Sequence, residues 1–263
     1  VIGNFRNDTT ADNFSGLIDQ VRIYSGKLED EQVSQLYAET SSDNDDLTLG
    51  GPPETIISAN ANAGFSIVKY EGNGIAGTKI PHGLSAAPEM IIVKNLSNSH
   101  SGNAHWAVYH TSIGNTKVIY LNRTNAETTS SAFWNDTTPT STVFSIGNDN
   151  DVNVNGEEFI AYCFHSVSGF SKIGSYSGNN TGQTITTGFQ PDFLMLKKTN
   201  TTSEWWIMDS VRGTTNNLEA NTSDGENTGI SGAPTFVSTG FNFSGSTFNE
   251  TGTDWIYVAF KIN

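Results

Sequence analysis

Short runs rich in apolar residues recur along this chain, separated by residues that favour turns. Short runs bounded in this way predict strands rather than helices. The first group of predicted strands lies at 66–70, 90–94, 106–110, 142–146 and 158–164. The second group lies at 171–176, 193–198, 205–208, 236–243 and 255–262. The last strand of each group is apolar on both faces, as expected for a strand in the middle of a sandwich core.

Helical spacing is found near the N-terminus, where Val33, Leu36 and Tyr37 recur within residues 29–38. Acidic residues crowd the first turn of this segment, where the helix dipole stabilises negative charge. The pattern as a whole predicts an all-β fold of antiparallel, jelly-roll-like β-sandwich domains, with one short helix near the N-terminus.

The two groups of strands form an internal repeat. Residues 88–94 correspond to 191–197, and the order of the remaining elements is the same in both groups. We therefore expect one β-sandwich repeat at 64–168 and another at 169–263. An acidic run followed by Gly-Gly-Pro-Pro indicates a linker at 41–63.

Composition excludes several classes of protein. The 263 residues include 13 basic and 27 acidic side chains, for a formal net charge of −14, so we expect no nucleic-acid partner. No apolar run reaches the roughly 20 residues of a membrane-spanning helix, so we expect no membrane insertion. The single cysteine, Cys163, lies in an apolar strand, and we expect it to be a small core residue. The chain begins with Val1, and we expect it to be part of a longer protein.

Two resemblances to known families add to this picture. Residues 14–24 and 28–37, with Gly16, Ile18 and Asp19 at the start of a strand, resemble the closing segment of laminin-G-like (concanavalin-A-like) domains. The resemblance implies that residues 1–40 are the C-terminal end of such a domain.

The repeat unit itself resembles a second family. Virion structural proteins of marine tailed phages contain segments that are similar to residues 159–179, 187–192 and 206–210, together with Arg212 and Asn217. In those proteins an uncharacterised β-rich domain follows a laminin-G-like domain. The resemblance implies a virion location, other virion proteins as partners, and the homotrimeric assembly common in tail fibres.

A candidate calcium loop precedes the last strand of the first repeat. Asp151, Asn153 and Asn155, with a following glycine, match the start of an EF-hand loop, but its twelfth position is Tyr162 rather than Glu. A looser Ca2+ site would use Asp149, Asp151, Asn153 and Asn155. The sequence favours the alternative, a turn at Asn155-Gly156 with polar flanks.

Tryptophans are candidates for stacking on sugars, because an indole face matches the apolar face of a pyranose ring. Trp134 lies in a polar segment with Asn135 and Asp136, and we predict these three as ligand-binding residues. Trp205 and Trp206 point to opposite sides of one strand, so we predict that Trp206 faces solvent or a ligand.

No nucleophile elbow, metalloprotease helix, phosphate loop or paired acid and base can be recognised, so we expect a protein that is not an enzyme. Asp209 and Arg212 are expected to pair and to order a loop. The first functional hypothesis is a phage tail-fibre or receptor-binding protein that contacts host surface glycans. The alternatives are a capsid or tail decoration protein without a ligand and, third, a polysaccharide depolymerase.

Overall fold

The structure is a computed structural model that describes residues 55–97 and 105–262. Regular structure in this part of the chain is almost entirely β, and every strand pairing is antiparallel. Two short turns of helix complete it, the 3-10 turn η1 (Ala61–Ala63) and α2 (Ser131–Trp134). The prediction of an all-β fold of antiparallel sandwiches is therefore confirmed. The helix predicted at 29–38 and the laminin-G-like segment at 1–40 lie outside the described residues.

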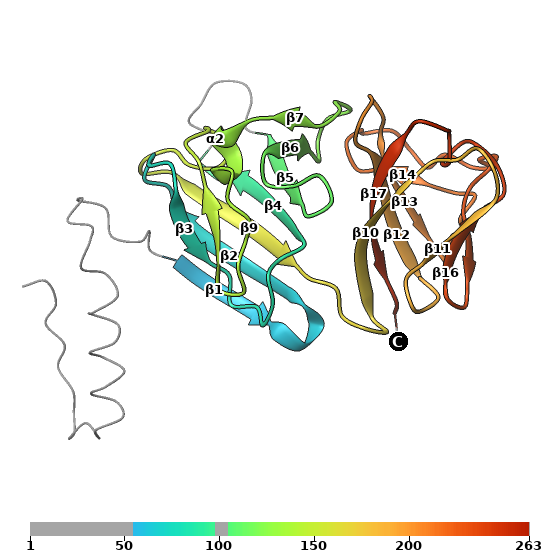
Figure 1. The fold of residues 1–263 in the computed structure, drawn as a ribbon, viewed down its shortest axis with the longest axis horizontal. Coiled ribbons are helices and arrows are strands. Elements are labelled where there is room, and N and C mark those ends of the chain that lie inside the picture. The colour runs from blue at the N-terminus through green and yellow to red at the C-terminus, as the bar shows by residue number, and fades with distance from the viewer. Residues whose placement is uncertain (1–54, 98–104, 263) are drawn as a thin grey trace, which may run out of the picture. The chain divides into compact units, whose positions relative to one another are not determined.

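The first repeat pairs a large sheet with a small one (Figure 1). The large sheet has the order β1-β2-β9-β4-β5-β6-β7. Its strands are β1 (Thr55–Asn60), β2 (Phe65–Glu71), β4 (Met90–Asn95), β5 (Trp106–His110), β6 (Lys117–Tyr120), β7 (Thr128–Thr129) and β9 (Glu158–Phe164). The small sheet is made of β3 (Thr78–Pro81) and β8 (Val143–Ile146). The core between them includes Tyr70, Ile91, Val93, Phe144 and Phe159.

The second repeat follows the same plan. Its large sheet has the order β10-β17-β12-β13-β14, which repeats the order β2-β9-β4-β5-β6 of the first. These strands are β10 (Ser171–Ser177), β12 (Phe193–Lys198), β13 (Trp205–Asp209), β14 (Leu218–Glu219) and β17 (Asp254–Phe260). Opposite them lie β11 (Gln183–Thr186), β15 (Thr235–Val237) and β16 (Gly240–Phe243).

Two of the segments assigned from the sequence differ in the structure. Residues 55–60, expected within the linker at 41–63, form β1 and pair with β2 along their whole length, because Ile56 and Ile57 continue a strand pattern. Residues 41–54 lie outside the described part of the chain. The single strand predicted at 236–243 is a hairpin, in which Ser238 and Thr239 turn the chain between β15 and β16.

A third apolar cluster joins the two repeats, which belong to one compact unit of the chain. It is built from the outer faces of the two large sheets, with Met90, Ile92, Val108, Ile113 and Ile119 on one side and Ile173, Trp205, Ile256 and Val258 on the other. The Trp205 indole donates a hydrogen bond from Nε1 to the carbonyl of Tyr120, at 2.8 Å. Each repeat therefore covers one apolar face of the other.

The two repeats fill one equivalent core position in different ways. In the first, Val68 of β2 lies opposite Ala161 of β9. In the second, Gly174 of β10 lies opposite Tyr257 of β17, and a Cβ on Gly174 would come within 2.6 Å of the Tyr257 hydroxyl. The first repeat fills this position with valine and alanine, and the second fills it with glycine and tyrosine. The filled volume is therefore similar in the two repeats.

This exchange predicts coupling between the two positions. Gly174→Val should destabilise the fold by roughly 1–3 kcal/mol, because the methyl groups would overlap the tyrosine ring. Adding Tyr257→Ala should recover part of that loss, because the pair then copies the first repeat. Urea unfolding of the wild type, both single variants and the double variant measures the coupling energy. Losses that simply add would contradict this packing.

Candidate functional site

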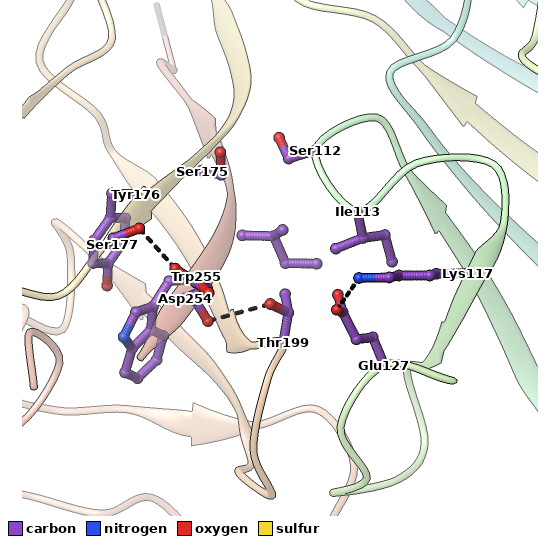
Figure 2. Close-up of a pocket in the computed structure, with 11 residues that line it drawn as sticks. Ser112, Ile113, Lys117, Glu127, Ser175, Tyr176, Ser177, Thr199, Asp254 and Trp255 are labelled. Atoms are coloured by element: carbon purple, nitrogen blue, oxygen red, sulfur yellow. Dashed lines mark hydrogen bonds and ion pairs between the residues drawn. The ribbon is translucent and has the colours of Figure 1, made fainter. Parts of the chain in front are cut away.

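The strongest candidate for a binding site is a hollow of about 240 Å³ at the junction of the two repeats, which we call the boundary hollow. Figure 2 shows its walls, one from each repeat. The polar side chains of the walls include Ser112, Lys117, Glu127, Ser175, Ser177, Thr199 and Asp254. These groups offer hydroxyl, ammonium and carboxylate partners, so the hollow can both donate and accept hydrogen bonds.

The charged groups of the hollow are held by neighbours. Lys117 and Glu127 form an ion pair on the wall of the first repeat, and 18% of the Glu127 side chain is exposed. On the opposite wall, Asp254 Oδ1 accepts a hydrogen bond from the Ser177 hydroxyl at 2.6 Å. Asp254 Oδ2 also accepts from the Asn200 amide at 3.3 Å. The two carboxylates are therefore oriented before any ligand arrives, which reduces the entropic cost of binding.

The inner side of the hollow is apolar and rigid. Ile113, Ile256 and Trp255 line it and are all buried. The Trp255 ring stacks on Tyr176 with an interplanar angle of 5°, and its Nε1 donates to the Thr253 hydroxyl at 2.8 Å. Because this indole lies in the core, it presents no free face for stacking, and the groups open to a ligand are those of the polar walls.

Backbone hydrogen bonds tie the two walls together. The amide of Glu127 donates to the carbonyl of Thr199 at 2.7 Å, and the amide of Ser203 donates to the carbonyl of Thr124 at 2.9 Å. The segment 124–127 of the first repeat is thereby fastened to the β12–β13 turn of the second. The width of the hollow is fixed by these bonds.

Lys197 strengthens this attachment from inside. Its side chain is 0% exposed, and its Nζ donates to the carbonyls of Thr124 (3.0 Å) and Ser203 (2.7 Å). Burial lowers the pKa of Lys197 from 10.5 to about 8, with the charge of Lys198 adding to this effect and that of Glu204 opposing it. A buried ammonium is costly unless it is hydrogen-bonded, and here two carbonyls meet that need.

The lowered pKa predicts how stability depends on pH. Between about pH 8 and about pH 10.5 the folded chain has lost the Lys197 proton while the unfolded chain still holds it. The unfolded state then binds more protons, so the free energy of unfolding contributed by this group rises with pH across that window.

This pH dependence can be tested by urea unfolding of the wild type and of Lys197→Met at about pH 8 and at about pH 10.5. The variant Lys79→Met, which changes an exposed lysine, is the control. The stability of the wild type relative to Lys197→Met should increase towards the higher pH. A constant difference would contradict the burial of a charged amine.

A second, more open hollow of about 370 Å³ lies beside residues 122–125 of the first repeat. Its lining includes Arg123, Asn125 and Glu204. It also contains two equivalent asparagines, Asn122 and Asn221, whose side-chain oxygens accept from the amides of the tryptophans that begin β5 and β13, at 3.0 and 2.8 Å. Since these asparagines serve the same structural purpose in both repeats, this hollow is the weaker candidate.

The prediction that Trp134 contacts a ligand is wrong, because its indole is only 1% exposed. Ser130 caps the single turn α2, and this turn directs Trp134 into the core, where Nε1 donates to the carbonyl of Lys117 at 3.0 Å. Asn135 and Asp136 follow with positive φ angles of 50° and 47° and reverse the chain. Neither lines the two hollows, so their ligand role stays a prediction.

Trp205 and Trp206 do point to opposite faces of β13, as predicted. Trp205 belongs to the cluster shared by the repeats, whereas Trp206 packs against the core of the second repeat. The Trp206 ring meets Phe248 edge-on, with centroids 5.4 Å apart. Its half-buried indole is therefore occupied by a core contact rather than presented flat to a sugar.

Asn153, predicted as a calcium ligand, is part of a turn that occurs in both repeats. Its Oδ1 accepts from the amide of Asn73 at 2.8 Å, and its Nδ2 donates to the carbonyl of Gly147 at 2.7 Å. In the second repeat, Asn249 accepts in the same way from the amide of Asn179 at 3.1 Å. The spacing that resembles a metal loop is explained by this repeated contact.

The other residues predicted as calcium ligands also form hydrogen bonds or turns with neighbouring parts of the chain. Asp149 Oδ1 accepts from the amide of Asp151, and Asp151 Oδ1 accepts from the amide of His105, at 2.9 and 2.7 Å. Partial burial raises the pKa of Asp149, and the charge of Asp151 raises it further. Asn155 is exposed and lies in the turn that the sequence favoured. Across residues 55–97 and 105–262, no group of three or more His, Cys, Asp or Glu side chains could hold a metal ion, and the Ca2+ site stays a prediction.

Arg212 organises the loop after β13, as expected from its pairing with Asp209. Its Nε donates to Asp209 Oδ2 at 2.6 Å, and its Nη1 donates to Glu226 at 3.1 Å. Asn217, the last residue before β14, is 0% exposed, and neither polar atom of its side-chain amide has a hydrogen-bond partner among the described residues. The register of β14 against β13 makes Asn217 the equivalent of Val118, a core residue of the first repeat.

This comparison predicts that Asn217→Val stabilises the protein. A buried amide without partners costs about 1–3 kcal/mol, and valine copies the first repeat at this position. The midpoint of urea unfolding should rise relative to the wild type. Val118→Asn, the reverse change in the first repeat, should lower it; a loss of stability in Asn217→Val would show that the amide has a partner.

The residues of the boundary hollow were not found from the sequence. Ser, Thr and Asp are common along this chain, and nothing in their spacing distinguishes Ser177 or Asp254. One signal is present for the lysine that fastens the walls, because Lys197 lies within the strongly apolar repeated strand 193–198, where burial is expected. Cys163, by contrast, is buried in β9 as predicted, and burial raises its pKa to about 12.

The fold and the hollow define a class: a two-repeat, all-β protein with a rigid polar hollow at the junction of its repeats. The chain belongs to the family described as "Domain of unknown function (DUF7483)", which matches residues 17–263. Comparison with curated proteins and with solved structures gives no match. Among the described residues, no helix has the length and apolar character needed to cross a membrane.

Proposed function

We propose that this protein is a non-catalytic attachment module of a phage virion, of the tail-fibre or receptor-binding type, that contacts host surface glycans. The observation that carries the glycan part is the boundary hollow, whose polar groups Lys117, Glu127, Ser177 and Asp254 converge from two repeats. The virion part rests on the resemblance of the repeat unit to phage structural proteins.

The chemistry of the hollow suits sugar hydroxyls. A hydroxyl donates one hydrogen bond and accepts others, so it can pair with carboxylates such as Asp254 and with donors such as the Ser177 hydroxyl or the Lys117 ammonium. Specificity then comes from the geometry of polar contacts, since unpaired polar groups are costly to bury.

The size of the hollow limits the ligand. A volume of about 240 Å³ is below the roughly 300–1,000 Å³ of sites that enclose drug-sized molecules. The hollow therefore accommodates a single sugar unit of a longer glycan, and affinity for one unit is weak. The homotrimer that we propose would raise the apparent affinity through multivalency.

Two alternatives remain to be tested against this proposal. A decoration protein would have no ligand and would use the hollow only as part of the repeat junction. A depolymerase would use the two carboxylates, Glu127 and Asp254, as acid and base across a glycosidic bond.

A binding experiment separates these functions. The protein is applied to a printed glycan array and to purified bacterial surface polysaccharides, alongside Asp254→Arg, which places a long cationic side chain in the hollow. Binding by the wild type should fall by at least about tenfold in the variant. Asp224→Arg makes the same change in charge at an exposed position outside the hollow and should bind normally.

The outcomes are distinct. Absence of binding to every glycan would contradict the proposal and favour a decoration protein. Shortening of a bound polysaccharide during incubation would contradict the non-catalytic part and favour a depolymerase.

A further inference from the structure

The charges of the boundary hollow carry information about which sugars it accepts. Lys117 is the one basic residue among those that line it, and its Nζ is paired with Glu127. Asp254 supplies a second carboxylate from the other repeat. The lining therefore carries two negative charges against one positive charge, and the positive charge already has a partner.

The charge of the whole chain is negative, like the charge of the lining. The chain has a formal net charge of −14, so the potential around it opposes anions. Two further lysines lie near the hollow: Lys197 is buried and donates to the carbonyls of Thr124 and Ser203. Lys198 is paired with Glu250 at 3.1 Å and lies 5.3 Å from the centre of the Trp255 ring. A sugar carboxylate that entered the hollow would have to displace Glu127 from Lys117 or lie unpaired beside two carboxylates, and both are unfavourable.

We infer that the boundary hollow selects uncharged sugars and rejects acidic ones, and that the Lys117–Glu127 pair sets this specificity. The inference rests on the proposed glycan-binding function and deepens it by naming the class of sugar. Glu127 is the specificity-determining residue, because it neutralises the only ammonium in the lining that could receive an acidic sugar.

Glu127 is suited to this role by its position. Its backbone amide is bonded to the carbonyl of Thr199, so the residue is held in place independently of its carboxylate. Replacing the carboxylate with an amide keeps the shape of the side chain and this backbone bond. Glu127→Gln should therefore leave the walls intact while releasing Lys117 from its charged partner.

The test uses matched probes. A neutral polysaccharide that binds the wild type is compared with the same polymer after its primary alcohols have been oxidised to carboxylates. The wild type should bind the oxidised polymer at least about tenfold more weakly than the neutral polymer. In Glu127→Gln this difference should shrink to about threefold or less, because Lys117 can then pair with the new carboxylates.

A control variant excludes a general effect of charge. Glu250→Gln removes one negative charge from the same kind of ion pair outside the hollow and should keep the wild-type preference for neutral polymer. The double variant Lys117→Met, Glu127→Gln should lose the binding of oxidised polymer that the single variant gains. Thermal unfolding of each variant confirms that it is folded.

The possible failures can be told apart. Equal binding of both polymers by the wild type would overturn the inference while leaving the proposed function intact. An unchanged preference in Glu127→Gln would show that Lys117 and Glu127 do not set it. Absence of binding to every neutral polysaccharide together with binding of an acidic one would overturn the inference alone, and absence of binding to every glycan would overturn the proposed function as well.

Discussion

The outer faces of the two large sheets are apolar, and the rest of the structure depends on their burial against each other. In β4, Ile91 and Val93 point to the core of the first repeat, whereas Met90 and Ile92 point to the shared cluster. Full burial of one large aliphatic side chain contributes about 1.5–3 kcal/mol, so neither face can be left in water without a large loss. Each repeat thus completes a core that the other cannot complete alone.

The boundary hollow follows from the same packing. Ile113 and Ile256 belong both to the shared cluster and to the lining of the hollow, so the hollow begins where apolar contact ends. Beyond them the walls become polar, and the buried Lys197 with its two carbonyl partners keeps those walls together. A site formed in this way is rigid, because moving its walls would disturb an apolar core.

The local pattern of apolar and polar residues predicts most of the strands, but it does not predict the boundary hollow. The apolar runs of β4 and β12 are a local property of the sequence, and apolar residues on both faces also indicate that β9 and β17 are inner strands. Trp134 was misjudged because its neighbours in sequence are polar, whereas the single turn that Ser130 caps directs the indole inward. The hollow could not be predicted, since Glu127 and Asp254 become neighbours only through the packing of two sheets.

Comparison of the repeats separates residues that hold the fold from residues that shape the hollow. The hydroxyls of Tyr70 and Tyr176 make the same bond in both repeats, each at 2.7 Å. Asp254 of the hollow is instead the equivalent of Glu158, which is paired with Lys69 on its own sheet. The two walls come from different parts of the repeat, residues 112–127 in the first and residues 175–177, 199 and 254–256 in the second. The difference between Asp254 and Glu158 shows that equivalent positions of the two repeats have diverged. A binding site with this origin belongs to the junction rather than to either repeat, because each repeat supplies only one of its walls.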